Sequence, residues 1–321
     1  MSRIVVTGLI PDAGRDLLRS SGHDLWEWTD EGPIPREELL NRVGGADGVV
    51  TLLTERVDDE LLSAAGPQLR AVCNVAVGYN NIDVPACQRR GVVVTNTPGV
   101  LTDATADIAM ALTLMATRRL GEGERLIRSG SPWRWSMFMM LGTGIQGRRL
   151  GIVGMGQIGT ALARRARAFG MTISYSNRSP IPADTAQELG AVRLSLQDLL
   201  ATSDVVSLHC PYTPETHHLI GADQLRAMKR TAFLINTARG PVVDEAALVA
   251  ALEASEIAGA GLDVFEKEPE VHPGLLDRDD VVLVPHLGSA TIETRSAMAE
   301  LAARNVLAVL GGQPPLTPVG A

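Results

Sequence analysis

The chain has 321 residues, which is enough for two hydrophobic cores, because longer chains generally divide into domains of about 100 to 200 residues each. Its composition of 45% hydrophobic and 21% charged residues, without low-complexity runs, is typical of a folded globular protein and argues against disorder. A net charge of −8 and a pI near 5.3 argue against a nucleic-acid partner, since phosphates repel an acidic surface.

The first hundred residues alternate short β-branched runs with helical patterns. Strands that alternate with helices in this way form βαβ units on a parallel sheet, so we expect an α/β domain here. The expected strands are Arg3 to Gly8, Gly48 to Leu53, Arg70 to Val75 and Val92 to Asn96. The expected helices are Asp12 to Arg19, Arg36 to Val43, Asp58 to Ala65 and Val84 to Arg90.

A long helix of small and apolar residues is predicted next, from Thr102 to Arg119. Its longest apolar stretch, Ile108 to Ala116, is shorter than the about 18 residues that a membrane-spanning helix needs. The amino terminus enters the first strand directly and carries no signal-peptide pattern. We therefore expect a cytoplasmic protein without a membrane partner.

A second alternating series follows and predicts a second parallel sheet. Its expected strands are Leu150 to Val153, Thr172 to Ser176, Asp204 to Cys210, Thr231 to Ala238, Ala258 to Val264 and Val281 to Pro285. The last helix, Thr291 to Leu310, begins after this sheet ends and is expected to pack on the first domain. The predicted fold is thus two doubly wound α/β domains, residues 1–100 with 288–321 and residues 101–287.

A glycine-rich motif opens the second domain. The strand ending at Val153 runs into Gly154-Met155-Gly156-Gln157-Ile158-Gly159, which opens a helix expected over Thr160 to Phe169. The first glycine permits a tight turn, the second lets a pyrophosphate approach the backbone, and the third lets helix and strand pack closely. With a strand before it and a helix after it, the motif predicts a dinucleotide site.

The end of the next strand bears on cofactor choice. An acidic residue there would bind the ribose hydroxyls of NADH, but this chain has Ser176, Asn177, Arg178 and Ser179. Without a carboxylate, and with a guanidinium available for a 2′-phosphate, we expect NADPH to be preferred. Alternatively Arg178 is an ordinary turn residue, and NADH is used as well.

The cysteines and histidines give no sign of a metal site. Cys73, Cys87 and Cys210 are odd in number, widely spaced and form no CxxC pair, so we expect reduced, structural thiols. No His and carboxylate cluster occurs at ligand spacing, and no metal is expected.

Four motifs in order resemble the D-isomer-specific 2-hydroxyacid dehydrogenases over essentially the whole chain. They are Gly151 to Gly159, Asn236 to Gly240, Gly261 to Pro269, and Pro285 to Ala290. Within that family the sequence is most similar to glyoxylate/hydroxypyruvate reductases and bacterial 2-ketogluconate reductases. The resemblance implies a flavodoxin-like substrate domain, a Rossmann cofactor domain, and reduction of a small 2-keto acid to the D-2-hydroxy acid.

The resemblance also implies a catalytic set. Arg239 would hold the substrate carboxylate, His286 would protonate the carbonyl oxygen, and Glu268 would stabilise the imidazolium. Both Arg239 and His286 follow apolar strands, so they are expected at the carboxyl edge of the sheet, where ligands bind. Taken singly, each has a plainer interpretation: a surface arginine, a structural histidine, or a solvated glutamate beside Glu266 and Glu270.

Further contacts follow from the resemblance. His209, Cys210 and Pro211 are expected on the adenine side of the cofactor, and Thr237, Ala238, Asp263 and Gly288 are expected to complete its site. The histidines outside the catalytic set, which we expect to be structural, are His23, His209, His217, His218 and His272.

A loop of the first domain, Val75-Ala76-Val77-Gly78, matches the segment whose backbone N–H groups bind the substrate carboxylate in relatives. Glycine at position 78 permits such close approach. Phosphite-oxidising relatives have lysine where this chain has Val77, and formate-oxidising relatives have glutamine where it has Glu268, so both activities are disfavoured.

The segment Pro132 to Met140 contains two of the four tryptophans and three of the ten methionines. In the family this stretch is a dimerisation arm, so a homodimer is expected. Trp133 or Trp135 would reach the neighbouring substrate site or simply pack in the interface, for which aromatic residues and methionine are typical. A competing function is a catalytically idle, dinucleotide-sensing scaffold like the family's corepressors.

Overall fold

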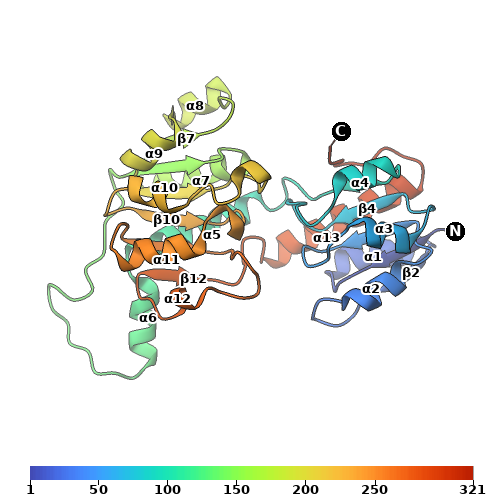
Figure 1. Cartoon of the computed structure of the whole chain (residues 1–321), viewed down its shortest axis with the longest axis horizontal. Coiled ribbons are helices and arrows are strands. Elements are labelled where there is room, and N and C mark those ends of the chain that lie inside the picture. Colours follow the sequence, from blue (N-terminus) through green and yellow to red (C-terminus); the bar gives the residue numbers. More distant parts are fainter. Residues whose placement is uncertain (321) are drawn as a thin grey trace. The chain divides into compact units, whose positions relative to one another are not determined.

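The computed structural model describes residues 1–320, which form two compact units. The first unit combines residues 1–101 with the chain from residue 289 onward, and the second is Thr102–Gly288. Each unit is built on one parallel sheet with its own helices (Figure 1). The expectation of two parallel α/β domains is therefore confirmed. No described helix is long and apolar enough to cross a membrane.

The first unit has a five-stranded sheet in the order β2-β1-β3-β4-β5, with every pair parallel. This is the flavodoxin-like strand order, in which the connections reverse direction beside β1. Val5 lies opposite both Trp26 and Val49, which fixes the register at the centre of the sheet. The strands are β1 Arg3–Val6, β2 Asp24–Glu27, β3 Gly48–Thr51, β4 Ala71–Asn74 and β5 Val93–Thr95.

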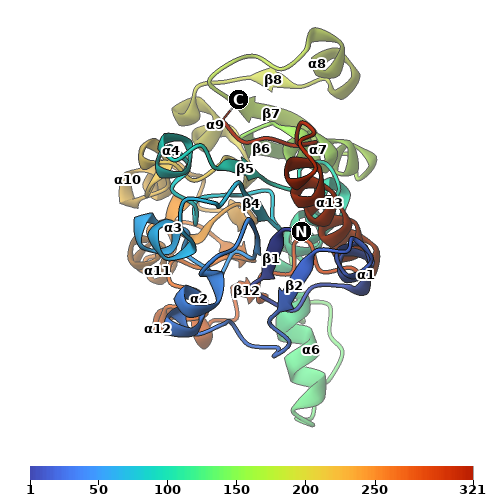
Figure 2. The same cartoon turned by 90° about the vertical axis from the view of Figure 1, so that its right-hand side faces the viewer.

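Five helices cover this sheet: α1 Asp12–Ser20, α2 Arg36–Val43, α3 Asp59–Ala65, α4 Val84–Arg89 and α13 Ile292–Leu310. The carboxy-terminal helix α13 lies beside α1 in both views (Figures 1 and 2). The two helices approach closely because α1 carries a glycine at the crossing, where a Cβ on Gly14 would lie 2.6 Å from the Ala299 carbonyl oxygen. Buried alanines of α13 then complete the apolar cluster on that face of the sheet.

The second unit has a seven-stranded sheet in the order β12-β11-β10-β9-β6-β7-β8. Strands β6 to β11 have the order of the Rossmann fold, and the connections between strands reverse direction at β6. The strands are β6 Arg149–Val153, β7 Thr172–Ser176, β8 Val192–Arg193, β9 Val205–Leu208, β10 Phe233–Asn236, β11 Gly259–Leu262 and β12 Val281–Leu283. The α-helices are α5 Thr102–Thr117, α6 Leu120–Arg128, α7 Gln157–Ala168, α8 Ala183–Leu189, α9 Leu196–Thr202, α10 Ala222–Ala227, α11 Glu245–Glu253 and α12 Pro273–Leu276. Short 3-10 turns span Pro214–Thr216 and Gly240–Val242.

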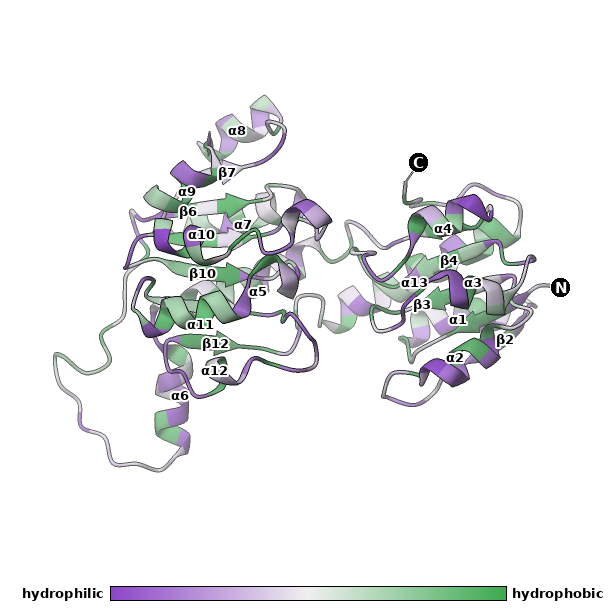
Figure 3. Cartoon of the chain, in the orientation of Figure 1, coloured by the Kyte–Doolittle hydropathy of each residue, from purple (hydrophilic) through white to green (hydrophobic). Residues whose placement is uncertain are grey.

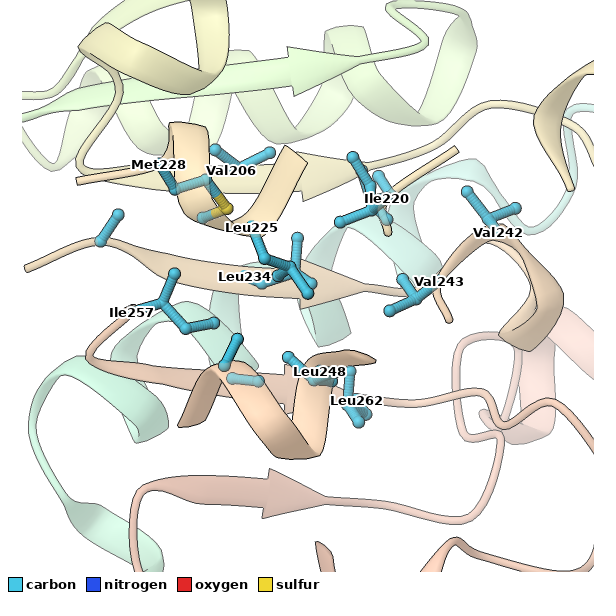
Figure 4. Close-up of a cluster of buried hydrophobic side chains, with 14 of the residues drawn as sticks. Val206, Ile220, Leu225, Met228, Leu234, Val242, Val243, Leu248, Ile257 and Leu262 are labelled. Carbon is cyan, nitrogen blue, oxygen red and sulfur yellow. The ribbon is translucent and has the colours of Figure 1, made fainter. Parts of the chain in front are cut away.

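Successive residues of the central strands enter opposite cores, as the two-residue period of a strand requires. In β10, Leu234 joins the cluster formed with α9, α10 and α11 (Figure 4), whereas Ile235 joins the cluster formed with α5 and α7. The central strands of both sheets consist mainly of hydrophobic residues (Figure 3), and their residues are buried on both faces. This double burial holds the strand ends, and the loops that follow them, in fixed positions.

Some boundaries differ from expectation. Helix α7 begins at Gln157 rather than Thr160, because Gly156 is its N-cap and the last glycine of the motif already lies within the helix. Strand β2 was not expected, since the edge position of Asp24–Glu27 leaves it without the apolar run of a buried strand. Helix α6 was not expected either, and it has no buried residue. The loop after α6 extends away from the remainder of the second unit (Figure 1).

Candidate active site

The second unit gathers the predicted polar residues at one edge of its sheet. Because all its strands are parallel, their carboxyl ends share that edge. Each predicted segment directly follows a strand: the glycine motif follows β6, Asn177 follows β7, His209 follows β9, Thr237 follows β10, Asp263 follows β11, and His286 lies three residues beyond β12.

The three motif glycines have different surroundings. Gly154 has a φ of +93°, and a Cβ there would lie 2.4 Å from the backbone nitrogen of Cys210. A Cβ on Gly159 would lie 2.7 Å from the Gly154 carbonyl oxygen, so helix and strand touch at this point. Nothing lies within 4 Å of a Cβ on Gly156. Gly154 and Gly159 are thus required for packing, while Gly156 leaves open space in front of the helix.

That space faces the first turn of α7. Within residues 1–320, the N–H groups of Gln157 and Ile158 donate to no protein acceptor. Unpaired N–H groups and the positive end of the helix dipole together favour an anion. The geometry therefore fits the pyrophosphate of a dinucleotide.

Asn177 is fastened to the glycine motif. Its Oδ1 accepts a 2.6 Å hydrogen bond from the backbone N–H of Met155, and its Nδ2 donates to the Met155 carbonyl oxygen at 3.4 Å. The following turn is held by Arg193, whose Nη2 donates to the carbonyl oxygens of Asn177 at 2.9 Å and Arg178 at 2.8 Å. The side chains of Arg178 and Ser179 remain exposed.

His209 is an uncharged residue in the middle of this edge. Its Nε2 lies 2.8 Å from Ser207 Oγ, and its Nδ1 lies 3.5 Å from Thr237 Oγ1. Burial lowers the pKa of His209 to about 4, and burial likewise raises the pKa of the Cys210 thiol to about 11. Near neutral pH both groups are therefore neutral, which suits a surface that packs against an uncharged ring.

Asp263 organises the turn that carries His286. Its two carboxylate oxygens accept the backbone N–H groups of Leu287 at 2.5 Å and Gly288 at 2.8 Å. The backbone N–H of His286 donates to the Asp263 carbonyl oxygen at 2.9 Å. Burial raises the pKa of Asp263, although these amide donors and the His286 charge oppose that rise. The His286 backbone itself has a φ of +52°.

Glu268 and His286 form a pair, with Glu268 Oε2 2.8 Å from His286 Nδ1. The other oxygen, Oε1, accepts the backbone N–H of Phe265 at 3.0 Å. Burial raises the pKa of Glu268, but the hydrogen bond and charge of His286, the Phe265 amide and the Arg239 charge together bring it below its usual value. Glu268 is therefore an anion at neutral pH. Its hydrogen bond engages Nδ1 of His286, so Nε2 is the ring nitrogen that Glu268 does not contact.

Arg239 completes this group. The residue is partly buried, and its Nη1 donates to the Ala238 carbonyl oxygen at 2.7 Å. Burial lowers the pKa of Arg239, while the nearby Glu268 carboxylate acts in the opposite direction. The structure thus brings Arg239, Glu268 and His286 together as one cation, one carboxylate and one imidazole.

The loop of the first unit presents a separate feature. The carbonyl oxygens of Ala76, Val77 and Gly78 each accept a hydrogen bond. Their donors are, in the same order, Thr97 N at 2.8 Å, Asn96 Nδ2 at 2.7 Å and Asn74 Nδ2 at 2.8 Å. With the carbonyl groups turned inward, the N–H groups of Ala76, Val77 and Gly78 donate to no acceptor within the described residues. Three adjacent unpaired donors are suited to binding an anion.

Comparison with known proteins identifies this arrangement. Residues 110–288 match the family model described as "D-isomer specific 2-hydroxyacid dehydrogenase, NAD binding domain". The chain is 49% identical over 320 residues to the glyoxylate reductase of Thermococcus onnurineus, covering 98% of this chain and 95% of that protein. The chain belongs to the D-isomer specific 2-hydroxyacid dehydrogenase family.

Solved structures agree with this family membership. A glyoxylate reductase from Paecilomyes thermophila superposes with a TM-score of 0.89 at 37% identity, covering 99% of this chain and 98% of that one. The NADPH-dependent glyoxylate/hydroxypyruvate reductase from Sinorhizobium meliloti, in complex with NADP and malonate, gives a TM-score of 0.87 at 36% identity, covering 99% and 97%. Residues 110–288 of the second unit therefore correspond to the family's NAD-binding domain.

Sequence reasoning overlooked several residues that support the site of this dehydrogenase. Arg193 holds the turn after β7, and His218, expected only to be structural, contacts Glu266 in the segment that carries Glu268. The available signal was the acidic run around Glu268. Carboxylates that are withdrawn from water need hydrogen-bond partners, and a histidine is one such partner. The 48-residue separation of His218 and Glu266 hid that contact.

Proposed function

We propose that this chain catalyses the NADPH-dependent reduction of a small 2-keto acid to the D-2-hydroxy acid. The observation that carries the proposal is the Glu268–His286 pair at 2.8 Å beside the partly buried cation of Arg239. A 2-keto acid presents a carboxylate and a carbonyl oxygen that becomes an alkoxide during reduction. A fixed cation and a proton donor meet those two requirements.

A reduced nicotinamide nucleotide, if held by the residues at the carboxyl edge of the second unit, would supply the hydride that the keto carbon needs. His286 gives its Nε2 proton to the carbonyl oxygen, so that the carbonyl becomes a hydroxyl group and the imidazole becomes neutral. Glu268 holds the ring through Nδ1 and stabilises the imidazolium before transfer. Arg239 binds the substrate carboxylate and orients the carbonyl carbon.

We assign a second carboxylate contact to the loop of the first unit. The unpaired N–H groups of Val77 and Gly78 support this role, as does the fixed direction of their carbonyl oxygens. The expected substrate-binding residues are then Val75, Ala76, Val77, Gly78, Arg239 and His286. On this assignment the first unit is the substrate domain.

The cofactor is proposed to lie across the carboxyl edge of the second unit. The N–H groups of Gln157 and Ile158 would hold the pyrophosphate, with Gly156 leaving room for it. Asn177, Arg178 and Ser179 would surround the adenosine ribose, and the absence of a carboxylate among these residues favours NADPH. His209, Cys210, Pro211, Thr237, Ala238, Asp263 and Gly288 would line the remainder.

Glyoxylate, hydroxypyruvate and 2-ketogluconate are the proposed substrates, and the names of the relatives support the first two. One experiment tests the activity itself: NADPH oxidation is followed by the loss of its absorbance, with these three acids and phenylpyruvate as substrates. We expect turnover with at least one of the small keto acids, such as glyoxylate. Binding of NADPH without oxidation by any of the four would instead indicate a dinucleotide-sensing scaffold.

We further propose that the chain is a homodimer joined through α6 and the arm that follows it. The arm exposes Trp133, Trp135, Met137, Phe138 and Leu141, of which Phe138 is 85% exposed. A contiguous set of large apolar side chains in water is unfavourable and typical of a surface that another chain covers.

A further inference from the structure

Two carboxylates near the proposed catalytic set are joined in an unusual way. Glu245 lies in the first turn of α11, and Glu266 lies in the loop after β11. Glu245 Oε1 accepts the backbone N–H of Glu266 at 2.8 Å, and Glu266 Oε2 accepts the backbone N–H of Glu245 at 3.1 Å. Each side chain thus binds the main chain of the other. We call this reciprocal pair the Glu245–Glu266 clasp.

The clasp holds a carboxylate in an unfavourable place. Glu245 is only 6% exposed, and burial raises its pKa, with the neighbouring Glu266 charge adding to the rise. Helix α11 does not need Glu245 for capping, because Asp244 is the N-cap and accepts from Ala247 N at 2.9 Å. What Glu245 provides is a fixed position for the main chain at Glu266.

A third residue fastens the clasp from the opposite side. His218 Nε2 lies 2.6 Å from Glu266 Oε1, so both oxygens of Glu266 are engaged. The backbone N–H of His218 donates to the Pro241 carbonyl oxygen at 2.8 Å, in the 3-10 turn that follows Arg239. His218 therefore ties the loop of Glu266 to the turn of Arg239.

The same short loop determines where the Glu268 carboxylate lies. Phe265 N–H donates to Glu268 Oε1, and the next N–H along the chain is the one that Glu245 accepts. The carbonyl group of Phe265 lies against Gly240, where an added Cβ would be 1.8 Å from the carbonyl carbon. A displacement of the loop at Glu266 would therefore move the amide that orients Glu268.

We propose that Glu245 and His218 are positioning residues, which act through Glu266 to hold Glu268 against His286. This inference rests on the proposed function, in which Glu268 orients the proton donor. Neither residue touches the substrate or the cofactor. Each sets the geometry of a pair that must be aligned to well within 1 Å, since misplacement by about 1 Å costs as much as ~100-fold in rate.

The first test compares Glu245→Ala with Glu245→Gln. Glutamine keeps an oxygen that accepts the Glu266 N–H, whereas alanine removes the acceptor. We expect Glu245→Ala to lower kcat with glyoxylate by about 10- to 100-fold, with KM for NADPH near the wild-type value, and Glu245→Gln to retain most activity. Glu253→Ala is the matched control, because Glu253 is an exposed glutamate at the other end of α11.

A second readout does not depend on turnover. The His286 Nδ1 proton, hydrogen-bonded to Glu268, should give a downfield imidazole N–H signal in the proton NMR spectrum of the histidine-labelled protein, assigned by its loss in His286→Ala. We expect Glu245→Ala to weaken or broaden this signal and Glu245→Gln to keep it. If no keto acid is reduced, this measurement still tests the clasp separately from the proposed function.

His218→Asn decides the matter if Glu245→Ala does not fold. Asparagine tolerates the φ of +49° at this position but is too short to reach Glu266. We expect His218→Asn to fold and to show the same loss of signal and a smaller fall in kcat. A wild-type His286 signal and wild-type kcat in whichever of the two variants folds would overturn the proposal.

Discussion

His286 occupies a backbone conformation that its neighbours enforce. Its φ of +52° lies in the left-handed region, which costs most non-glycine residues about 1 to 2 kcal/mol, although histidine visits it more than bulkier side chains do. Asp263 compensates by accepting the two N–H groups that follow His286 and, through its carbonyl oxygen, the N–H of His286 itself. The imidazole is consequently aimed by the backbone as well as by Glu268.

Replacement of His286 by alanine tests the proposed proton donor. We expect kcat for keto-acid reduction to fall by about 10²- to 10⁴-fold, the usual contribution of a positioned general acid. The dissociation constant of NADPH, measured by fluorescence titration, should stay near wild type, because the cofactor contacts proposed above lie elsewhere. Retention of most of the activity would remove His286 from the mechanism.

Glu268→Gln tests the partner of His286 through the pH dependence of the rate. The Glu268 pKa lies below its usual value, so the carboxylate is ionised over the working range and favours a protonated imidazole. When the charge is removed, the protonated imidazole loses the carboxylate that stabilises it. The alkaline limb of the kcat profile for reduction should therefore move toward lower pH. A profile that superposes on that of the wild type would mean that another group stabilises the imidazolium.

At the scale of single elements, the turn after β7 is held more firmly than its sequence indicates. Asn177 binds Met155 through its side chain, and Arg193 of β8 binds the turn through two carbonyl oxygens. The side chain of Arg178 is exposed, but its backbone is held in place by these hydrogen bonds. A backbone that is already fixed reduces the conformational entropy that is lost when the charged side chain binds a phosphate.

Cofactor preference can be tested at that turn with a paired substitution, Asn177→Asp together with Arg178→Ser. Aspartate keeps the oxygen that accepts the Met155 N–H, so the turn should persist while the charge changes. The wild type should favour NADPH over NADH by about 10- to 100-fold in kcat/KM, as expected for a charge-assisted hydrogen bond of about 1.5 to 3 kcal/mol, and the double variant should reverse this order. Equal use of both cofactors by the wild type would show that Arg178 points into solvent.

Elements with a strong apolar period were predictable from the sequence, and elements without one were not. The glycine motif, the central strands and the helices of the first unit follow from alternation and turn residues, since both faces of each sheet are buried. Strand β2 is half exposed, and α6 buries nothing, so neither leaves a hydrophobic signature.

The catalytic segments show the same limit. Arg239 and His286 could be predicted because each follows a strand, and the order of the family motifs added Glu268. The contact between Glu245 and Glu266, in the loop that carries Glu268, and the contact of Arg193 with the turn at Arg178 depend on tertiary placement across 21 and 15 residues. No local periodicity of the sequence encodes such pairs, and they become visible only in the three-dimensional structure.

At the scale of the whole molecule, the arm after α6 tests the proposed dimer. Trp135 is 75% exposed and Phe138 85% exposed in the single chain. The double substitution Trp135→Ser with Phe138→Ser should shift the sedimentation coefficient from dimer toward monomer. A matched surface change on the first unit, Leu316→Ser, removes an apolar side chain that is 52% exposed and should leave the dimer intact. A wild-type chain that sediments as a monomer at micromolar concentration would contradict the proposal.

The order of the chain through its two units has a consequence for synthesis. The second unit is complete once residue 288 has left the ribosome, but the first unit still lacks α13, whose Ala299, Ala302 and Val306 fill the core against β1, β3 and β4. Nascent chains fold domain by domain as their contacts become available. The first unit should therefore close only after the second unit is complete, because its sheet lacks α13 until residues 292–310 have been made.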